Sequence, residues 1–187
     1  MADFALEIDA CKITPTHSVK LLGVTLDRYL TFDEHIDNVV KKCHGLIGAL
    51  AKAAPYLTRN LLRIAYVSLI RSQMEYCSTF ASAAPSQLLN TVQKISARII
   101  CGVPRDAYLA PLLESLRLES LESGHTNHII KIVESIMFSD CNPALKHIFT
   151  VRSDGALISS RQPRIAIGKR RFTVFAKELY DNELSTS

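Results

Sequence analysis

The sequence lacks the features that mark secreted, membrane-spanning or disulfide-stabilised proteins. Its five cysteines are odd in number and widely spaced, and none forms a C-x-x-C pair, which is typical of reduced thiols in an intracellular protein. The N-terminus has neither the basic start nor the apolar run of a signal peptide. No segment approaches the ~20 apolar residues that a membrane-spanning helix needs. We therefore expect a soluble intracellular protein, nuclear or cytoplasmic, with no membrane partner.

Motifs of the common enzyme classes are also missing. The sequence contains no G-x-x-x-x-G-K or G-x-G-x-x-G phosphate loop, no G-x-S-x-G nucleophile elbow and no Asp-Asp pair. His125 and His128 are one helical turn apart, and Cys141 and His147 follow, but these spacings match no common structural zinc pattern. The histidine pair fits a partly exposed helix face better than a metal site. No cofactor is predicted for this chain, although zinc at these four residues stays open.

The composition is that of an ordinary globular protein. Of its 187 residues, 48% are hydrophobic and 21% are charged, which is enough for one domain with a sizeable core and a small appendage. The formal net charge of +4 is mild, but six basic residues and no acidic one lie between Arg161 and Lys177. That stretch is either a contact for a polyanion or a solvated basic tail.

The hydrophobic pattern predicts strands at the N-terminus. Residues 4 to 26 combine period-two alternation with a run of β-branched and aliphatic residues from Val19 to Leu26. Gly23 lies inside that run, which suggests a bulge or a close backbone approach. Two or three short strands do not form a stable sheet alone. We therefore expect a short β-hairpin or the edge of a larger sheet.

A helical period replaces the alternation from Asp33 onward. Apolar residues recur every three or four positions until Pro55, so the pattern predicts one long helix with a cap at Thr31 or Asp33. Gly45 and Gly48 lie within this helix. Because glycine costs about 1 kcal/mol relative to alanine in a helix, we expect tight helix packing at both positions.

Further helices are predicted as far as residue 138. One begins at the N-cap Thr58 and carries Arg59 and Arg63 on one face. A helix after Pro85 ends at Gly102, and a short helix near Tyr108 precedes a longer one. Residues 139 to 168 are predicted to be mostly loop, with a short helix or strand nearer the C-terminus. The apolar stripe predicted for the helix after Pro85 consists of Leu88, Val92, Ile95 and Ile99.

Several strings resemble one protein family. The string V-K-x-L-G-V-x-L-D at 19–27, followed by L-x-F-x-x-H-I at 30–36, resembles the junction of palm and thumb in a non-LTR (LINE/jockey-type) retrotransposon reverse transcriptase. SLIRSQMEYC at 68–77 and VQKISARIICG at 92–102 are similar to later family strings in the same order. The resemblance covers about residues 17 to 184. Two departures are Ser72, where the family often has proline, and Ser123-Gly124, where it usually has two arginines.

The resemblance implies a mainly α fold in three parts. Residues 1–30 would be the β-stranded end of the palm, with its hairpin beside the primer strand. Residues 31–140 would form a helical thumb-like bundle, and residues 141–187 a loop-rich basic tail. A thumb grips an RNA–DNA or other nucleic-acid duplex mainly through its phosphates. The candidate contacts are Lys20, Lys41, Lys42, Arg59, Arg63, Lys94, Arg98, Lys169, Arg170 and Arg171.

The resemblance does not imply an active enzyme by itself. RNA-directed DNA polymerases use palm carboxylates to hold two divalent metal ions, and this sequence has no Asp-Asp pair. Asp27 follows the strand as a single carboxylate and is interpreted as a turn residue. Magnesium would therefore belong to a palm site outside this chain. We expect the chain alone not to polymerise.

Two alternatives to duplex binding stay open at this point. The chain could be a helical interaction module whose apolar faces bind the missing palm and fingers, another protein or a second copy. It could also be a relic of a mobile element without a function, since the sequence does not say whether Met1 is a true start or the result of a truncated gene. The dependence of affinity on salt concentration distinguishes these possibilities, because binding to phosphates weakens steeply as the salt concentration rises and binding through an apolar surface does not.

Overall fold

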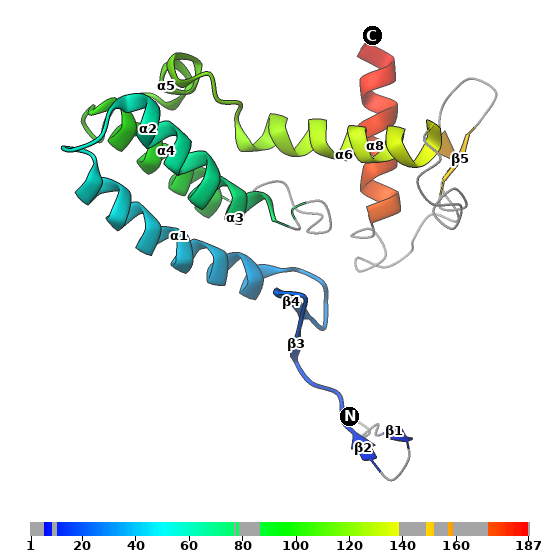
Figure 1. The fold of residues 1–187 in the computed structure, drawn as a ribbon. Coiled ribbons are helices and arrows are strands. Elements are labelled where there is room, and N and C mark those ends of the chain that lie inside the picture. Colours follow the sequence, from blue (N-terminus) through cyan, green and yellow to red (C-terminus); the bar gives the residue numbers. More distant parts are fainter. Residues whose placement is uncertain are drawn as a thin grey trace.

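Four short strands precede the first helix in the computed structural model (Figure 1), which describes residues 6–8, 11–76, 78, 87–138, 149–151, 157–158 and 172–186. Strand β1 (Leu6–Ile8) pairs with β2 (Cys11–Ile13), and β3 (Ser18–Leu21) pairs with β4 (Val24–Asp27), in both cases antiparallel. Helices make up most of the remaining described chain. The predicted fold class, mainly α after a short N-terminal β-hairpin, is confirmed.

The run from Val19 to Leu26 is a hairpin and not one strand. Leu22 and Gly23 have φ angles of 48° and 86°, and two consecutive left-handed residues are what a tight two-residue hairpin turn requires. Gly23 is therefore a turn residue, and the predicted bulge is wrong. Leucine is unusual at the first turn position, where asparagine, aspartate or glycine is preferred, so only Gly23 matches the usual residues of this turn.

Asp27 organises the connection from β4 to the first helix. Its carboxylate accepts hydrogen bonds from the backbone N–H groups of Tyr29 (2.9 Å), Thr31 (3.1 Å) and Phe32 (2.7 Å) and from the Thr31 hydroxyl (3.1 Å). Slight burial raises the pKa of Asp27, but these hydrogen bonds outweigh it and lower the pKa below its ordinary value. The interpretation of Asp27 as a turn residue is confirmed.

Helix α1 (Asp33–Ala53) begins and packs partly as predicted. Its N-cap is Phe32, at φ 63° and without a side-chain hydrogen bond, so the predicted caps Thr31 and Asp33 are wrong. Gly45 and Gly48 are exposed, and a Cβ atom added at either would meet nothing within 4 Å. The prediction of tight packing at these glycines is therefore also wrong. The buried stripe of α1 includes the predicted residues Val40, Cys43, Ile47 and Leu50.

The second helical segment changes its winding midway. Helix α2 (Arg59–Ala65) starts at Thr58, whose hydroxyl accepts from the Leu61 N–H at 3.5 Å, as predicted. It continues directly into the π-helix η1 (Tyr66–Arg71) and the short helix α3 (Ser72–Glu75), and the sequence did not predict this wider winding. The residues that this segment buries in the core are Leu62, Tyr66, Ile70 and Met74.

Helices α4 (Gln87–Cys101), α5 (Leu109–Leu116) and α6 (Leu121–Phe138) follow. Gly102 ends α4 at φ 66°, as predicted. The predicted stripe of α4 is displaced, because Leu88 is about half exposed while Gln93 and Ser96 are fully buried. Hydropathy alone does not place polar side chains in a core. The buried stripe of α4 consists of Leu89, Val92, Gln93, Ser96, Ala97 and Ile100.

The described helices build two hydrophobic cores, and α6 belongs to both. Its first residue, Leu121, packs in the larger core with α1, α2, η1, α3, α4 and α5. Farther along, α6 packs against α8 (Phe172–Thr186), which crosses it in Figure 1. Strands β5 (Thr150–Val151) and β6 (Leu157–Ile158) pair beside them, within the stretch that was predicted to be mostly loop. The second core consists of Ile129, Val133, Phe149, Leu157, Ala176 and Tyr180.

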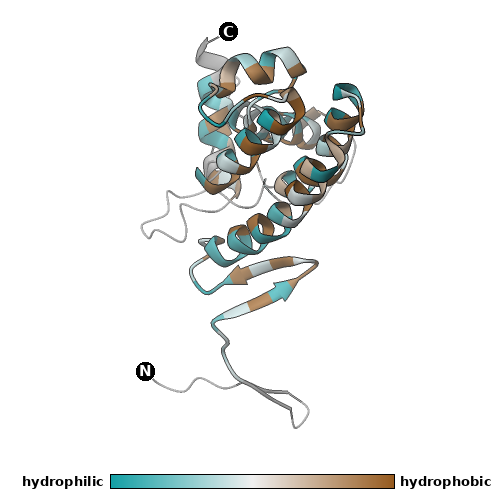
Figure 2. Ribbon diagram, turned by 90° about the vertical axis from the view of Figure 1, so that its left-hand side faces the viewer, coloured by the Kyte–Doolittle hydropathy of each residue, from teal (hydrophilic) through white to brown (hydrophobic). Residues whose placement is uncertain are grey.

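The β3–β4 hairpin lies at one end of the helical bundle, beyond the start of α1 (Figure 2). Its tip is held by Tyr76, whose hydroxyl donates to the Leu22 carbonyl oxygen at 2.6 Å. The Thr25 N–H points to Nδ1 of His35 on α1, at 3.5 Å. Two side chains of the bundle therefore fix the hairpin. Among the described helices, none has the length and apolar character to cross a membrane.

Candidate nucleic-acid interface

An open groove lies between the first turns of α2 and the C-terminal end of α5. Arg59 and Arg63 lie one turn apart on α2, and both line it, as their shared helix face predicts. Arg117, which follows α5, is the third arginine there. No carboxylate is among the described lining residues, so the groove holds three guanidinium groups without an acidic partner. Its lining consists of Arg59, Asn60, Arg63, Ser115, Leu116 and Arg117.

The two α2 arginines are anchored to the end of α5. Arg59 Nη2 donates to the Ser115 hydroxyl at 2.6 Å and contacts Cys101 Sγ at 3.2 Å. Arg63 Nε donates to the Leu116 carbonyl oxygen at 2.6 Å. These contacts suit cations, because the last carbonyl groups of a helix carry partial negative charge. A guanidinium has five N–H donors, so both arginines keep donors beyond these contacts.

Arg117 has an unusual backbone for an arginine. It follows the last residue of α5 with φ 51° and ψ 49°, and the next N–H, of Leu118, donates to the Leu113 carbonyl oxygen at 2.9 Å. This is the helix-ending arrangement in which glycine is usual, and a residue with a side chain costs about 1–2 kcal/mol there. Arg117 is not among the contacts predicted from the sequence. The signal that could have found it is an arginine at the end of a predicted short helix.

The other predicted cations lie outside this groove. Lys41 and Lys42 are neighbours on α1, Lys20 is on β3 and Lys94 is on α4. All four are exposed, and no ion pair joins them to another residue within the described part of the chain. These lysines are therefore available for phosphate contacts, but the structure does not gather them into one site.

Arg98 has a different position from the exposed lysines. Its Nε and Nη2 atoms donate to the Ala107 carbonyl oxygen at 3.2 Å and 2.7 Å. The side chain thus ties α4 to the loop before α5, which uses donors that a phosphate would need. Lys169, Arg170 and Arg171 lie outside the described residues.

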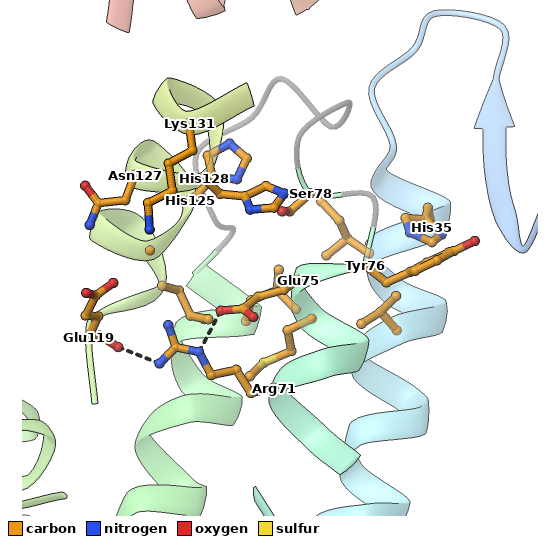
Figure 3. A pocket seen from close by; sticks show the side chains of 16 residues that line it. His35, Arg71, Glu75, Tyr76, Ser78, Glu119, His125, Asn127, His128 and Lys131 are labelled. Atoms are coloured by element: carbon orange, nitrogen blue, oxygen red, sulfur yellow. Dashed lines mark hydrogen bonds and ion pairs between the residues drawn. The ribbon is translucent and has the colours of Figure 1, made fainter. Parts of the chain in front are cut away.

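A separate cavity of about 240 Å³ lies between α1, α3 and α6 (Figure 3). Arg71, only 8% exposed, forms its floor. The Arg71 Nε atom donates to Glu75 Oε1 at 2.6 Å, and Nη1 donates to the Glu119 carbonyl oxygen at 2.9 Å. His125 and Lys131 project from α6 on the other side (Figure 3). The cavity therefore combines an ion pair between the buried Arg71 and the exposed Glu75 with polar groups from α6.

Two histidines of this cavity, His35 and His125, have a pKa below the ordinary value. Burial lowers the pKa of His125, and the charge of His128 lowers it further. Burial likewise lowers the pKa of His35, with a smaller effect of Lys42. Within the described residues, no three His, Cys, Asp or Glu side chains are placed to hold a metal ion. Cys141 and His147, which the zinc alternative would need, lie outside the described residues.

Gly124 on α6 packs closely against the Arg71 side chain. A Cβ atom at this position would lie 2.8 Å from Nη2 of Arg71. Arg71 therefore occupies the space that any side chain at position 124 would need. The sequence alone does not show that a guanidinium from η1 packs against this glycine.

Comparisons with known proteins identify no relative: no protein-family model matches the chain, no curated protein does, and no solved structure does. The reverse transcriptase resemblance therefore depends on the sequence strings alone and stays a prediction.

Proposed function

We propose that this chain is the palm-edge and thumb part of a non-LTR retrotransposon reverse transcriptase and that it grips an RNA–DNA duplex through the phosphates. The observation that carries the proposal is the groove between α2 and α5, where Arg59, Arg63 and Arg117 lie without a carboxylate. Catalytic carboxylates and their magnesium ions would belong to a palm outside this chain. The role of these residues is therefore binding and not chemistry.

Phosphate is the ligand class that this groove suits best. Guanidinium groups bind phosphate oxygens through paired N–H donors, with both charge and geometry matched. Three like charges in one groove repel one another, and an anion between them would relieve that repulsion. Contacts of this kind position a duplex without reading its sequence. The proposed binding is accordingly non-specific in sequence.

The exposed lysines would extend the contact beyond the groove. Lys41 and Lys42 on α1, Lys20 on the hairpin and Lys94 on α4 are solvent-exposed. A hybrid duplex presents its wide, shallow minor groove and its backbone to a protein, and lysines act there as mobile point charges. We expect each to add a small increment of affinity.

The test is fluorescence anisotropy of a labelled RNA–DNA hybrid across a salt series. The logarithm of the association constant should fall linearly with the logarithm of the salt concentration, with a slope of about −0.9 for each phosphate neutralised. Arg59→Gln should weaken binding while it keeps an amide donor for Ser115. Arg105→Gln is the matched control, because Arg105 is exposed and outside the groove. No binding at low salt by protein that unfolds cooperatively contradicts the proposal.

A second candidate function has its own supporting observation. Leu61, Ile64 and Leu69 on α2 and η1 are each about half exposed, and an apolar helix face of this kind suits a protein partner. Binding through that face would be nearly independent of salt. The same salt series therefore separates the interaction module from the duplex grip.

A further inference from the structure

We infer that Arg117 is a phosphate ligand, and that with Arg59 and Arg63 it forms a three-armed site for a single phosphate group. The inference rests on the proposed function only for the source of the phosphate, which is the nucleic-acid backbone. The affinity of the groove for phosphate follows from its own residues. None of the sequence strings pointed to Arg117.

The backbone of Arg117 supplies the first argument. The position closes α5 with φ 51°, its N–H donates to the Glu114 carbonyl oxygen at 2.9 Å, and Leu118 completes the helix-ending pattern. Glycine adopts this conformation without a steric cost, and arginine does not. An arginine here disfavours the fold through its backbone. Any benefit must therefore come from its side chain.

The surroundings of the side chain supply the second argument. Two cations of the described residues have carboxylate partners: Arg71 pairs with Glu75 at 2.6 Å and Lys177 with Asp181 at 2.8 Å. Around Arg117 the lining consists of two more arginines and the neutral donors Asn60 and Ser115. A phosphate group can accept hydrogen bonds from several of these groups at once. The groove thus has donors and positive charge, but no anionic acceptor among its described lining residues.

Two of the arginine side chains of the groove are held in position without a ligand. Arg63 Nε donates a hydrogen bond to the Leu116 carbonyl oxygen at 2.6 Å, and its Nη2 atom lies 3.4 Å from the Arg117 carbonyl oxygen. Arg59 is fixed on Ser115 at 2.6 Å. Side chains fixed in advance lose less conformational freedom when they bind. The two anchored arginines are therefore preorganised in the groove that Arg117 also lines.

A role in helix capping alone is the competing explanation. A cation after α5 interacts favourably with the helix dipole, and lysine would serve that purpose as well as arginine. Capping predicts that loss of the side chain lowers stability and leaves anion binding unchanged. A phosphate site predicts the reverse. Arg117→Gly distinguishes the two, because it removes the guanidinium and relieves the backbone in one change.

The first experiment measures thermal unfolding of the full chain in inorganic phosphate and in sodium chloride at equal ionic strength. For the native chain and for the control Arg105→Gly, we expect a higher Tm in phosphate than in chloride. For Arg117→Gly, this phosphate-specific increment should shrink, while the Tm in chloride stays equal or rises. The comparison between variants cancels the general stabilising effect of phosphate as a salt. An unchanged increment in Arg117→Gly, or a lower Tm in chloride, overturns the inference.

The second experiment titrates the labelled RNA–DNA hybrid with the same variants. Arg117→Gly should weaken binding of the hybrid and make the salt slope shallower by up to about 0.9, the value for one phosphate, whereas Arg105→Gly should leave both unchanged. Arg117→Lys should retain part of the affinity through its charge. If the hybrid does not bind but the phosphate increment depends on Arg117, the proposed function fails and the phosphate site stands. If the hybrid binds and Arg117→Gly changes nothing, the inference fails and the proposed function stands.

Discussion

Replacement of Gly124 by alanine tests the packing at the start of α6. The new Cβ atom would lie 2.8 Å from Nη2 of Arg71, which is closer than non-bonded atoms approach. A side-chain end can normally swing away from such a contact. Here the guanidinium is held by Glu75 through Nε at 2.6 Å and by the Glu119 carbonyl oxygen through Nη1 at 2.9 Å. Because Arg71 is 8% exposed, it has little room to move.

The expected magnitude follows from two opposing effects. Alanine is favoured over glycine in a helix by about 1 kcal/mol. Against this, Arg71 either stays in place, where overpacking costs about 1–3 kcal/mol, or moves and loses the charged hydrogen bond to Glu119, which costs about 1.5–3 kcal/mol. The Glu119 carbonyl oxygen keeps the Gln93 amide as a donor at 3.0 Å, which limits the loss. We expect Gly124→Ala to lower the free energy of unfolding by about 1–2 kcal/mol.

The assay is equilibrium unfolding in urea, with two matched controls in the same protein. A Cβ atom at Gly45 or Gly48 would meet nothing within 4 Å, so Gly45→Ala and Gly48→Ala should each raise the free energy of unfolding by up to about 1 kcal/mol. In an Arg71→Met background, Gly124→Ala should lose its destabilising effect, since the clashing atom is gone. If Gly124→Ala stabilises the native chain as much as Gly45→Ala does, the proposed role of Arg71 at this position is refuted.

Two further predictions concern the hairpin and the buried histidines. Tyr76→Phe removes the hydrogen bond to the Leu22 carbonyl oxygen, so the free energy needed to open the β3–β4 hairpin should fall by about 0.5–1.5 kcal/mol. Faster amide hydrogen exchange in the hairpin, with exchange in α1 unchanged, would support this. Equal exchange rates in the two proteins would argue against it. Burial lowers the pKa of His35 and of His125 below the ordinary 6.5. As the pH falls, the unfolded chain therefore binds protons at these histidines before the folded chain does. The free energy of unfolding should accordingly fall as the pH drops below 6.5. Urea unfolding at about pH 7.5 and 5.5 measures this loss, and the double variant His35→Gln, His125→Gln should reduce it; an unaltered pH dependence would exclude these two groups as its cause.

Local chemistry in the sequence was enough to place most helices. The apolar spacing in α1, the N-cap Thr58 and the terminal Gly102 each act within a few residues of themselves, so their effects can be read without the fold. The shared face of Arg59 and Arg63 is equally local, because it depends only on helical spacing. The mainly α class and the two α2 arginines of the groove therefore followed from the sequence.

Burial required the tertiary structure, since it depends on residues far apart in the chain. Gln93 is fully buried because its amide reaches the Glu119 carbonyl oxygen, 26 residues away. The turn at Leu22 is held by the Tyr76 hydroxyl, 54 residues away. Neither partner can be inferred from local hydropathy, so the stripe of α4 and the hairpin turn were missed.

The candidate site likewise has a part that the sequence determines locally and a part that depends on the tertiary structure. The sequence by itself determined that two arginines lie one turn apart at the start of a helix. Only the tertiary structure decided that α5 ends opposite them, at Ser115 and Leu116, and so places Arg117 in the same groove. The physical reason is that spacing along one helix is fixed by hydrogen bonds between near neighbours. The meeting of two helices is fixed instead by the packing of their buried faces.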